Sequence, residues 1–175
     1  MDVSSRMRIP FPRDLVYRTI RDQLLDLVPY MPSVKAIELQ QRTEEGGIIR
    51  FVNLWWAGTE IPAVAQRVLK PEMLSWIDRA SWDESHFTCD WSMETNALPG
   101  VLECAGRNVF KAVGDETDLE VTGTLALHMD KLPVPKLIGG AVRPVIERIV
   151  VSAIRPNLTN IGDAVSGYLK AQKPA

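Results

Sequence analysis

The hydrophobic pattern of this chain changes from the period of a strand to that of a helix close to residue 140. Between residues 34 and 127, apolar and polar residues alternate in a series of β-rich runs, as they do in strands that bury one face. Between residues 142 and 168 the apolar residues recur every three or four positions instead, which is the spacing of a helix. Pro156 lies inside this stretch and should kink it. The pattern predicts an antiparallel sheet followed by a long C-terminal helix.

Turn signals divide the alternating region into pairs of strands. Glu-Glu-Gly-Gly at residues 44–47 separates the first pair, and further turns are expected near residues 84–85 and 114–115. A short first strand is predicted within residues 4–12. Residues 13–32 have helical spacing that two prolines interrupt, so we expect one helix and then a short second helix or a turn. Residues 57–73 are compatible with either a further strand or a short helix.

Length and composition indicate one domain that spans residues 1–175. The element order makes it an α+β protein, with a curved antiparallel sheet of about six to seven strands wrapped around the final helix. The 20 basic and 22 acidic residues leave a net charge of −2, so we expect no nucleic-acid partner. No run of about 18 apolar residues exists and the start lacks a secretory signal, so we expect a cytoplasmic protein without stable membrane insertion.

Motifs for common cofactors and reactions are missing from the sequence. Two cysteines, Cys89 and Cys104, are too few for a disulfide framework, and no spacing typical of zinc ligands occurs. No nucleotide-binding or hydrolase signature is found near His86 or His128, which we expect to be surface residues. We therefore expect no metal and no cofactor.

Two segments near the start carry a family resemblance. In PFPRDLVYRTIRD the resemblance rests on Pro12, Asp14, Val16 and Tyr17, and in MPSVKAIELQQR a proline-bounded segment leads into the second strand. With the order of elements, these segments resemble the START-like, or SRPBCC, superfamily over nearly the whole chain. The resemblance implies the helix-grip fold of birch-pollen-allergen-type proteins, with a cavity between sheet and helix. Its members include lipid-transfer and coenzyme-Q-binding proteins, plant hormone receptors, polyketide cyclases and aromatases, so it implies no single reaction.

All five tryptophans lie between Trp55 and Trp91. In a strand, Trp76, Asp78 and Trp82 share one face, because side chains alternate. Either a packed core or the wall of a ligand pocket would account for such an aromatic face. Trp55 and Trp56 are adjacent, so only one of them faces inward, and the sequence does not decide which.

Asp78 is the residue that a packed core does not explain. An isolated buried carboxylate is costly, so Asp78 should either have a partner or a raised pKa. A structural role is the more common outcome, with Arg50, Arg67 and Arg107 as candidate partners. A raised pKa beside a cavity would instead indicate a functional site.

The last two strands and the final helix complete the expected pocket. Gly106 and Gly123 should face inward, where they leave space for a ligand or let the sheet bend. Apolar residues of the helix, including Ala153, should face the sheet. The residues that we predict to bind a ligand are Trp76, Asp78, Trp82, Phe87, Trp91, Cys104, Asn108, Leu125, Val145 and Ile149.

Three functions are compatible with this pattern. The first is binding of a hydrophobic small molecule, such as a lipid, a quinone or a polycyclic aromatic compound. The second is an enzyme of the polyketide cyclase or aromatase type, with Asp78 as general acid/base and Asn108 polarising a carbonyl. The third is a protein-interaction module, or a homodimer, anchored by the outward-facing residue of Trp55 and Trp56. The sequence favours ligand binding and leaves the ligand, catalysis and oligomeric state open.

Overall fold

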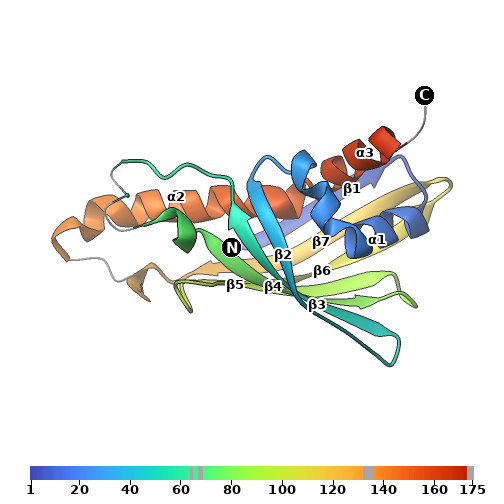
Figure 1. Ribbon diagram of the computed structural model, residues 1–175, viewed down its shortest axis with the longest axis horizontal. Coiled ribbons are helices and arrows are strands. Elements are labelled where there is room, and N and C mark those ends of the chain that lie inside the picture. The colour runs from blue at the N-terminus through green and yellow to red at the C-terminus, as the bar shows by residue number, and fades with distance from the viewer. Residues whose placement is uncertain (64, 67–68, 132–135, 173–175) are drawn as a thin grey trace.

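Seven antiparallel strands form one curved sheet, and helices cover its concave face (Figure 1). The structure is a computed structural model that describes residues 1–63, 65–66, 69–131 and 136–172, without the side chains of residues 72, 129, 136–139, 141–142 and 153. The spatial order of the strands is β1-β7-β6-β5-β4-β3-β2, so each strand from β2 to β7 pairs with its neighbour in sequence. Their bounds are β1 (Asp2–Ile9), β2 (Val34–Glu45), β3 (Ile48–Ala57), β4 (Ser75–Asp83), β5 (Thr88–Thr95), β6 (Leu102–Val113) and β7 (Glu116–Leu127).

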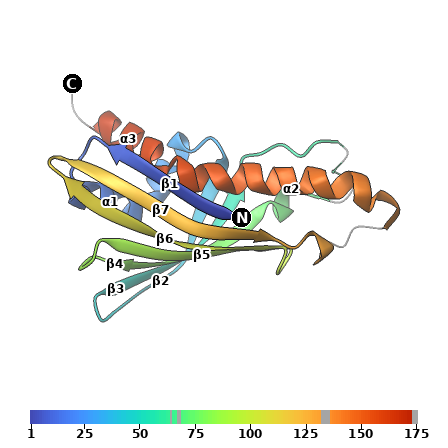
Figure 2. The same ribbon diagram turned by 180° about the vertical axis from the view of Figure 1, so that it is seen from behind.

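The helices lie at the two ends of the chain and pack on the same side of the sheet (Figure 2). α1 (Arg13–Asp22) and the 3₁₀ helix η1 (Leu24–Tyr30) connect β1 to β2, while α2 (Lys136–Thr159) and α3 (Ile161–Gln172) follow β7. Two further 3₁₀ turns are η2 (Pro71–Met73) and η3 (Met129–Lys131). The predicted α+β helix-grip architecture is confirmed. Within the described part of residues 57–73, β3 ends at Ala57, and the short helix is the 3₁₀ turn η2.

The C-terminal helical stretch is interrupted at Asn160, four residues after Pro156. Proline has no N–H, so it cannot donate the helical bond to the preceding turn. The Asn160 N–H still donates to the Pro156 carbonyl at 2.8 Å, which closes the last turn of α2. The Asn160 carbonyl in turn accepts bonds from the N–H groups of Asp163 and Ala164, which begins α3. The helix therefore continues through Pro156 and ends one turn later, while the kink at Pro156 itself stays a prediction.

Charged pairs cover the convex face of the sheet. Arg79 pairs with Glu94 at 2.7 Å, and the Arg107 guanidinium donates to Asp90 at 2.5 and 2.7 Å. Such exposed pairs add little stability individually, but they keep this face wet, as expected for an antiparallel sheet with one buried side.

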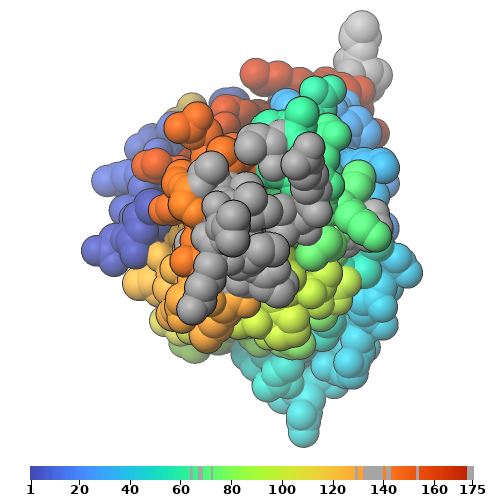
Figure 3. Space-filling view, turned by 90° about the vertical axis from the view of Figure 1, so that its left-hand side faces the viewer, coloured from blue at the N-terminus to red at the C-terminus, as the bar shows by residue number. Residues whose placement is uncertain are grey.

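The apolar interior divides into two clusters. The larger lies between the sheet and the helices and includes Trp55, Trp82 and Trp91. The smaller lies where residues 58–74 and 98–101 meet α2, and contains Ala65, Leu69, Val101, Ile146 and Ile149. Figure 3 shows this end of the molecule, with the segment after β3 beside α2. The second cluster explains why α2 is so apolar along a stretch that extends past the sheet.

Two glycines face each other across β6 and β7 and support the ring of Trp91. Gly106 pairs with Gly123, and Trp91 on β5 pairs with Gly106. A methyl group on Gly123 would lie 2.9 Å from Cη2 of Trp91, and one on Gly106 would also overlap the indole. The space that these glycines leave is therefore filled by Trp91 and is not part of an empty pocket.

We predict that Gly123→Ala destabilises the protein by about 1–3 kcal/mol, because overpacking displaces the Trp91 ring. The added methyl would also lie 2.5 Å from the Ala105 carbonyl oxygen. Gly140→Ala is the matched control, since nothing lies within 4 Å of the added methyl in helix α2. The control should raise stability slightly. Urea unfolding measures both, and a Gly123→Ala variant as stable as the wild type would contradict this packing.

Candidate functional site

A cavity of about 120 Å³ lies between the concave face of the sheet and the helices. Its inner wall comes from the strands β3 to β7, and its outer parts come from α1, η1, β2 and the junction of α2 with α3. The aromatic residues of the wall are Phe51, Trp55, Trp82 and Trp91, and its polar residues on the strands are Asn53, Asp78 and Asn108. The arrangement is an aromatic chamber with a few polar groups, which is typical of small-molecule sites.

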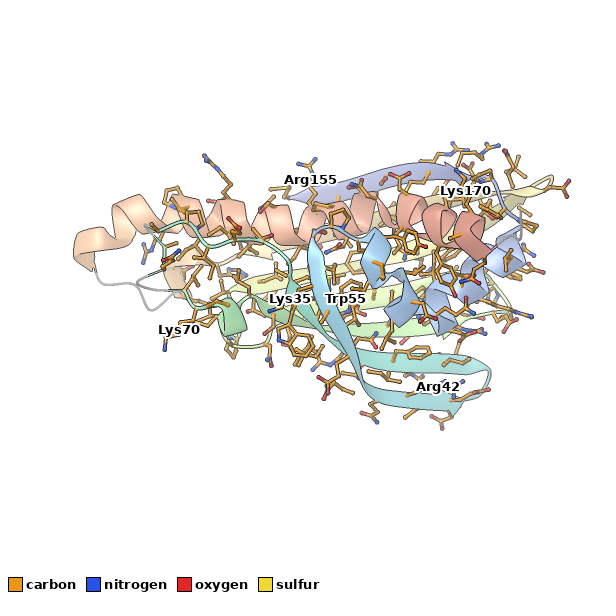
Figure 4. All side chains as sticks on the ribbon, turned by 45° about the horizontal axis from the view of Figure 1, so that its top comes forward. Lys35, Arg42, Trp55, Lys70, Arg155 and Lys170 are labelled. Atoms are coloured by element: carbon orange, nitrogen blue, oxygen red, sulfur yellow. The ribbon has the colours of Figure 1, made fainter. Side chains whose placement is uncertain are left out.

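Strand register decides which of the two adjacent tryptophans faces inward. Asn53 pairs with Asp78, and Trp55 pairs with Trp76, so the inner face of β3 meets the inner face of β4. Trp55 is buried among the core residues, whereas Trp56 is half-buried on the other face. Figure 4 labels Trp55 near the middle of the sheet, away from Arg42 on the β2–β3 hairpin. Trp55 is therefore the tryptophan that lines the cavity.

Asp78 is a buried acid without a charged partner among the described residues. The residue is 5 % exposed, and among the described residues its carboxyl group accepts one side-chain hydrogen bond, from Asn53 Nδ2 at 3.3 Å. Burial raises the pKa of Asp78 to about 6, while Asn53, Trp55 and the charge of Arg79 oppose this rise. The Trp55 indole Nε1 itself completes no hydrogen bond. Among the described residues, the carboxyl group thus has fewer hydrogen-bond donors than it can accept, on the side where it lines the cavity.

The expected arginine partners of Asp78 lie elsewhere. Arg50 is near Glu45 at 3.9 Å, and Arg107 pairs with Asp90, both on the solvent side of the sheet. These two candidates were wrong, because side-chain alternation places them on the opposite face from Asp78. The third candidate, Arg67, lies outside the described residues.

Asn108 is held by one of the cavity tryptophans. Trp91 Nε1 donates to Asn108 Oδ1 at 2.8 Å. An indole N–H can only donate, so the oxygen of the amide must face Trp91 and the NH₂ group remains the donor end of Asn108. The pair orients a hydrogen-bond donor at the cavity wall.

Four of the ten predicted ligand-binding residues line this cavity: Asp78, Trp82, Trp91 and Asn108. The described lining does not include the other six, which are Trp76, Phe87, Cys104, Leu125, Val145 and Ile149. Trp76 lies on the same inner face beside Trp55, and the two rings stack with centroids 5.7 Å apart. Val145 and Ile149 belong to the second apolar cluster, because this part of α2 extends past the cavity. The side chain of Ala153, also expected to face the sheet, lies outside the described part of the chain.

Phe87 departs from the expected alternation because it lies in the turn before β5. Its φ of 52° is unusual for a bulky residue and directs the ring away from the β5 pattern. The ring packs edge-on against Tyr17 at 5.2 Å, and the Arg13 guanidinium lies 3.5 Å above it. Cys104 and Leu125 are simply buried core neighbours across β6 and β7.

Sequence reasoning missed the mouth of the cavity. Leu25 and Leu39 border it and are 47 % and 42 % exposed. Arg21 and Asp22 also border it and are paired at 2.7 Å, with Arg21 bound to Glu84 as well. The available signal was weak, since Leu39 is an isolated apolar residue in a polar stretch of β2.

A serine, a histidine and an aspartate come together in the β4–β5 turn, but they do not form a catalytic triad. His86 Nδ1 lies 2.7 Å from Asp83 Oδ2 and 2.9 Å from Ser85 Oγ, so one nitrogen faces both groups. A triad needs the two nitrogens of the histidine to face the acid and the nucleophile separately. The contacts instead fold the turn, and they hold the pKa of Asp83 down to about 2.

Within the described chain, no group of three or more histidine, cysteine and acidic residues is placed to hold a metal ion. Among the helices of those same residues, none is long and apolar enough to cross a membrane.

Comparison with known proteins identifies relatives by structure. No family model matches the sequence, and no curated protein matches it. An aromatase/cyclase from Streptomyces sp. R1128 superposes with a TM-score of 0.67 and 16 % identity, over 100 % of this chain and 96 % of that one. A protein from Thermus thermophilus superposes with a TM-score of 0.62 and 22 % identity, over 99 % of this chain and 100 % of that one. A START superfamily protein from Mycobacterium smegmatis superposes with a TM-score of 0.52 and 14 % identity, over 98 % of this chain and 99 % of that one.

At these identities the likeness is one of fold. It covers almost the whole length of each chain, with the same sheet and C-terminal helix. The predicted helix-grip fold is therefore confirmed, while the fold alone assigns no ligand or reaction.

We predict that Asp78→Asn becomes more stable relative to the wild type as the pH rises. The folded wild type binds a proton at a pKa of about 6, whereas an ordinary aspartate does so near 3.8. Wild-type stability should therefore fall as the pH rises between these values, by about 3 kcal/mol in total. Asparagine does not titrate, so the variant lacks this loss.

Urea unfolding of both proteins between pH 4 and pH 7.5 measures the difference. Asp90→Asn is the control, because the ion pair with Arg107 lowers the pKa of Asp90, so this group titrates below the measured range and the difference from wild type should stay nearly constant. A constant difference between Asp78→Asn and wild type across this range would show that Asp78 is not buried in the folded protein.

Proposed function

Starting from the helix-grip fold, we propose that this protein binds a small, largely apolar molecule in the cavity lined by Trp55, Trp82 and Trp91. The observation that supports this most is the cavity itself, since four aromatic rings surround space that the core leaves unfilled. Asp78 and Asn108 would orient the ligand, because they are polar groups on an otherwise apolar wall. The exposed leucines at the mouth would let an apolar molecule enter.

The size of the cavity limits the ligand. Cavities of about 150 Å³ hold benzene, whereas sites for drug-sized ligands have roughly 300–1,000 Å³. At about 120 Å³, this cavity fits a molecule with a single ring. A lipid, a quinone with a chain or a polycyclic compound would need the mouth between η1 and β2 to open, so a one-ring ligand is favoured.

Ala80→Leu should abolish binding of a one-ring probe, because the larger side chain projects into the cavity beside Asp78. Ethylbenzene is a suitable probe, and the indole N–H signals of the five tryptophans report its place in a ¹⁵N NMR spectrum. In the wild type, signals of Trp55, Trp82 and Trp91 should shift more than that of Trp56.

Ser81→Leu is the matched control on the opposite face of the same strand and should bind as the wild type does. Native mass spectrometry of the purified protein would add the mass of any ligand retained from the cell. Unshifted indole signals at saturating ethylbenzene, or equal shifts in Ala80→Leu, would contradict the proposal.

A second candidate function is proton transfer by Asp78, as in a cyclase-type enzyme. It is favoured by one observation, which is the raised pKa of Asp78. A general base is most effective when its pKa lies near the working pH, and the pKa of this carboxyl group is about 6. The donor end of Asn108 would polarise a carbonyl of the substrate.

Acetophenone in D₂O tests this second function. If Asp78 removes a proton from the methyl group next to the carbonyl, deuterium should enter that position faster with the wild type than with Asp78→Asn. Exchange at the buffer rate with both proteins would exclude this role for the probe's class, small aromatic ketones.

A further inference from the structure

The cavity contains a negative charge that the described chain does not neutralise. At pH 7 a carboxyl group with a pKa of about 6 is ionised in about nine molecules of ten. Buried anions normally have a cation or several hydrogen bonds, but Asp78 accepts one long bond from Asn53 among the described residues. The group that this site lacks is therefore a cation or a strong donor.

Charged groups around Asp78 do not fill this role. On its own strand Arg79 points to the other face and pairs with Glu94. From α1, Arg21 reaches the cavity but is bound to Asp22 and Glu84. On β5, burial raises the pKa of Cys89 well above its usual value, so this thiol is uncharged.

The remaining elements around Asp78 contribute no cation to the cavity within the described chain. β3 and β6 present amides and aromatic rings, and the junction of α2 with α3 presents Leu158, Ile161 and an amide. On β2, Arg42 lies over the Phe51 ring at 5.8 Å, but it pairs with Glu44 and does not line the cavity. A ligand is then the natural source of positive charge.

The aromatic walls of the cavity would attract a cation in addition to the carboxylate of Asp78. Indole faces attract cations within about 6 Å, tryptophan most strongly, and the effect grows when water is excluded. Three tryptophans and Phe51 line the same small space as Asp78. An aromatic chamber with one carboxylate combines both interactions that a desolvated ammonium group needs.

We propose that the ligand of this cavity is a small organic cation, a primary or substituted amine on a one-ring or similarly compact apolar body, with Asp78 as its counter-ion and the tryptophan faces around its charge. This proposal rests on the proposed function of the cavity. It adds the charge of the ligand and the role of Asp78, which would be a binding group and not an acid or base.

Benzylammonium and ethylbenzene provide the test, because they have the same number of heavy atoms and nearly the same shape but differ in charge. Binding is followed by the tryptophan indole signals at pH 7.5. Benzylammonium should bind at least about tenfold more tightly than ethylbenzene, in line with a charged hydrogen bond in a partly dry site.

Asp78→Asn should remove this preference, because the counter-charge is gone while the cavity keeps its size. Asp90→Asn, which removes a carboxylate from the outer face, should keep it. In the wild type the preference should also decline below pH 6, as Asp78 takes up its proton.

Three results separate this proposal from the function on which it rests. Equal binding of both probes, unchanged in Asp78→Asn, would overturn the cation and leave an apolar binding protein. Preferential binding of benzaldehyde that strengthens below pH 6 would overturn it too, since protonated Asp78 would then be a donor to a carbonyl. Binding of no probe, with no ligand retained in native mass spectrometry, would overturn both proposals.

Discussion

The contact between the Trp91 indole and the backbone of Gly106 and Gly123 determines how the concave side of the sheet is filled. With hydrogen in place of a side chain at both glycines, the ring lies directly against the sheet. From there its N–H reaches Asn108 and the ring becomes part of the cavity wall. Any larger residue at either glycine would push the ring into the only space where Asp78 meets a cavity among the described residues. The shape of the site therefore depends on two glycines that are not among the residues lining the cavity.

Asp78 connects this packing to function. In a core without a cavity, a carboxyl group with one long hydrogen bond would be a serious defect, because its charge would lack both water and a partner. In a cavity with a mouth, the same carboxyl group costs some stability while empty and gains a partner when a ligand enters. Functional sites commonly contain groups that lower the stability of the free protein and contribute to its function. The proposed ligand binding and the raised pKa of Asp78 would thus both follow from the position of this one carboxyl group.

Much of the fold followed from periodicity in the sequence. The alternation in β4 to β7 correctly placed Trp76, Trp82 and Trp91 on one inner face, because a wet outer face leaves a clear pattern. The break at Asn160 was not predictable in the same way, since it depends on capping bonds that form after Pro156 has weakened the helix.

The site was harder to predict than the fold. Alternation indicates a face but not how far along the sheet the cavity extends, so Val145 and Ile149 were assigned to a pocket that α2 has already left at those positions. The mouth at Leu25 and Leu39 joins segments that are distant in sequence and carry no motif. The sequence alone did not show whether the space beside Gly106 and Gly123 is empty or filled. It is filled by the ring of Trp91, which lies on another strand.

The most direct measurement is the pKa of the Asp78 carboxyl group by ¹³C NMR, without and with benzylammonium. The account predicts a value of about 6 in the free protein, because the group is buried without a cation. It also predicts a clear fall when benzylammonium binds, because a neighbouring positive charge favours the ionised form. A value near 4 in the free protein, or one that saturating benzylammonium leaves unchanged, would contradict it.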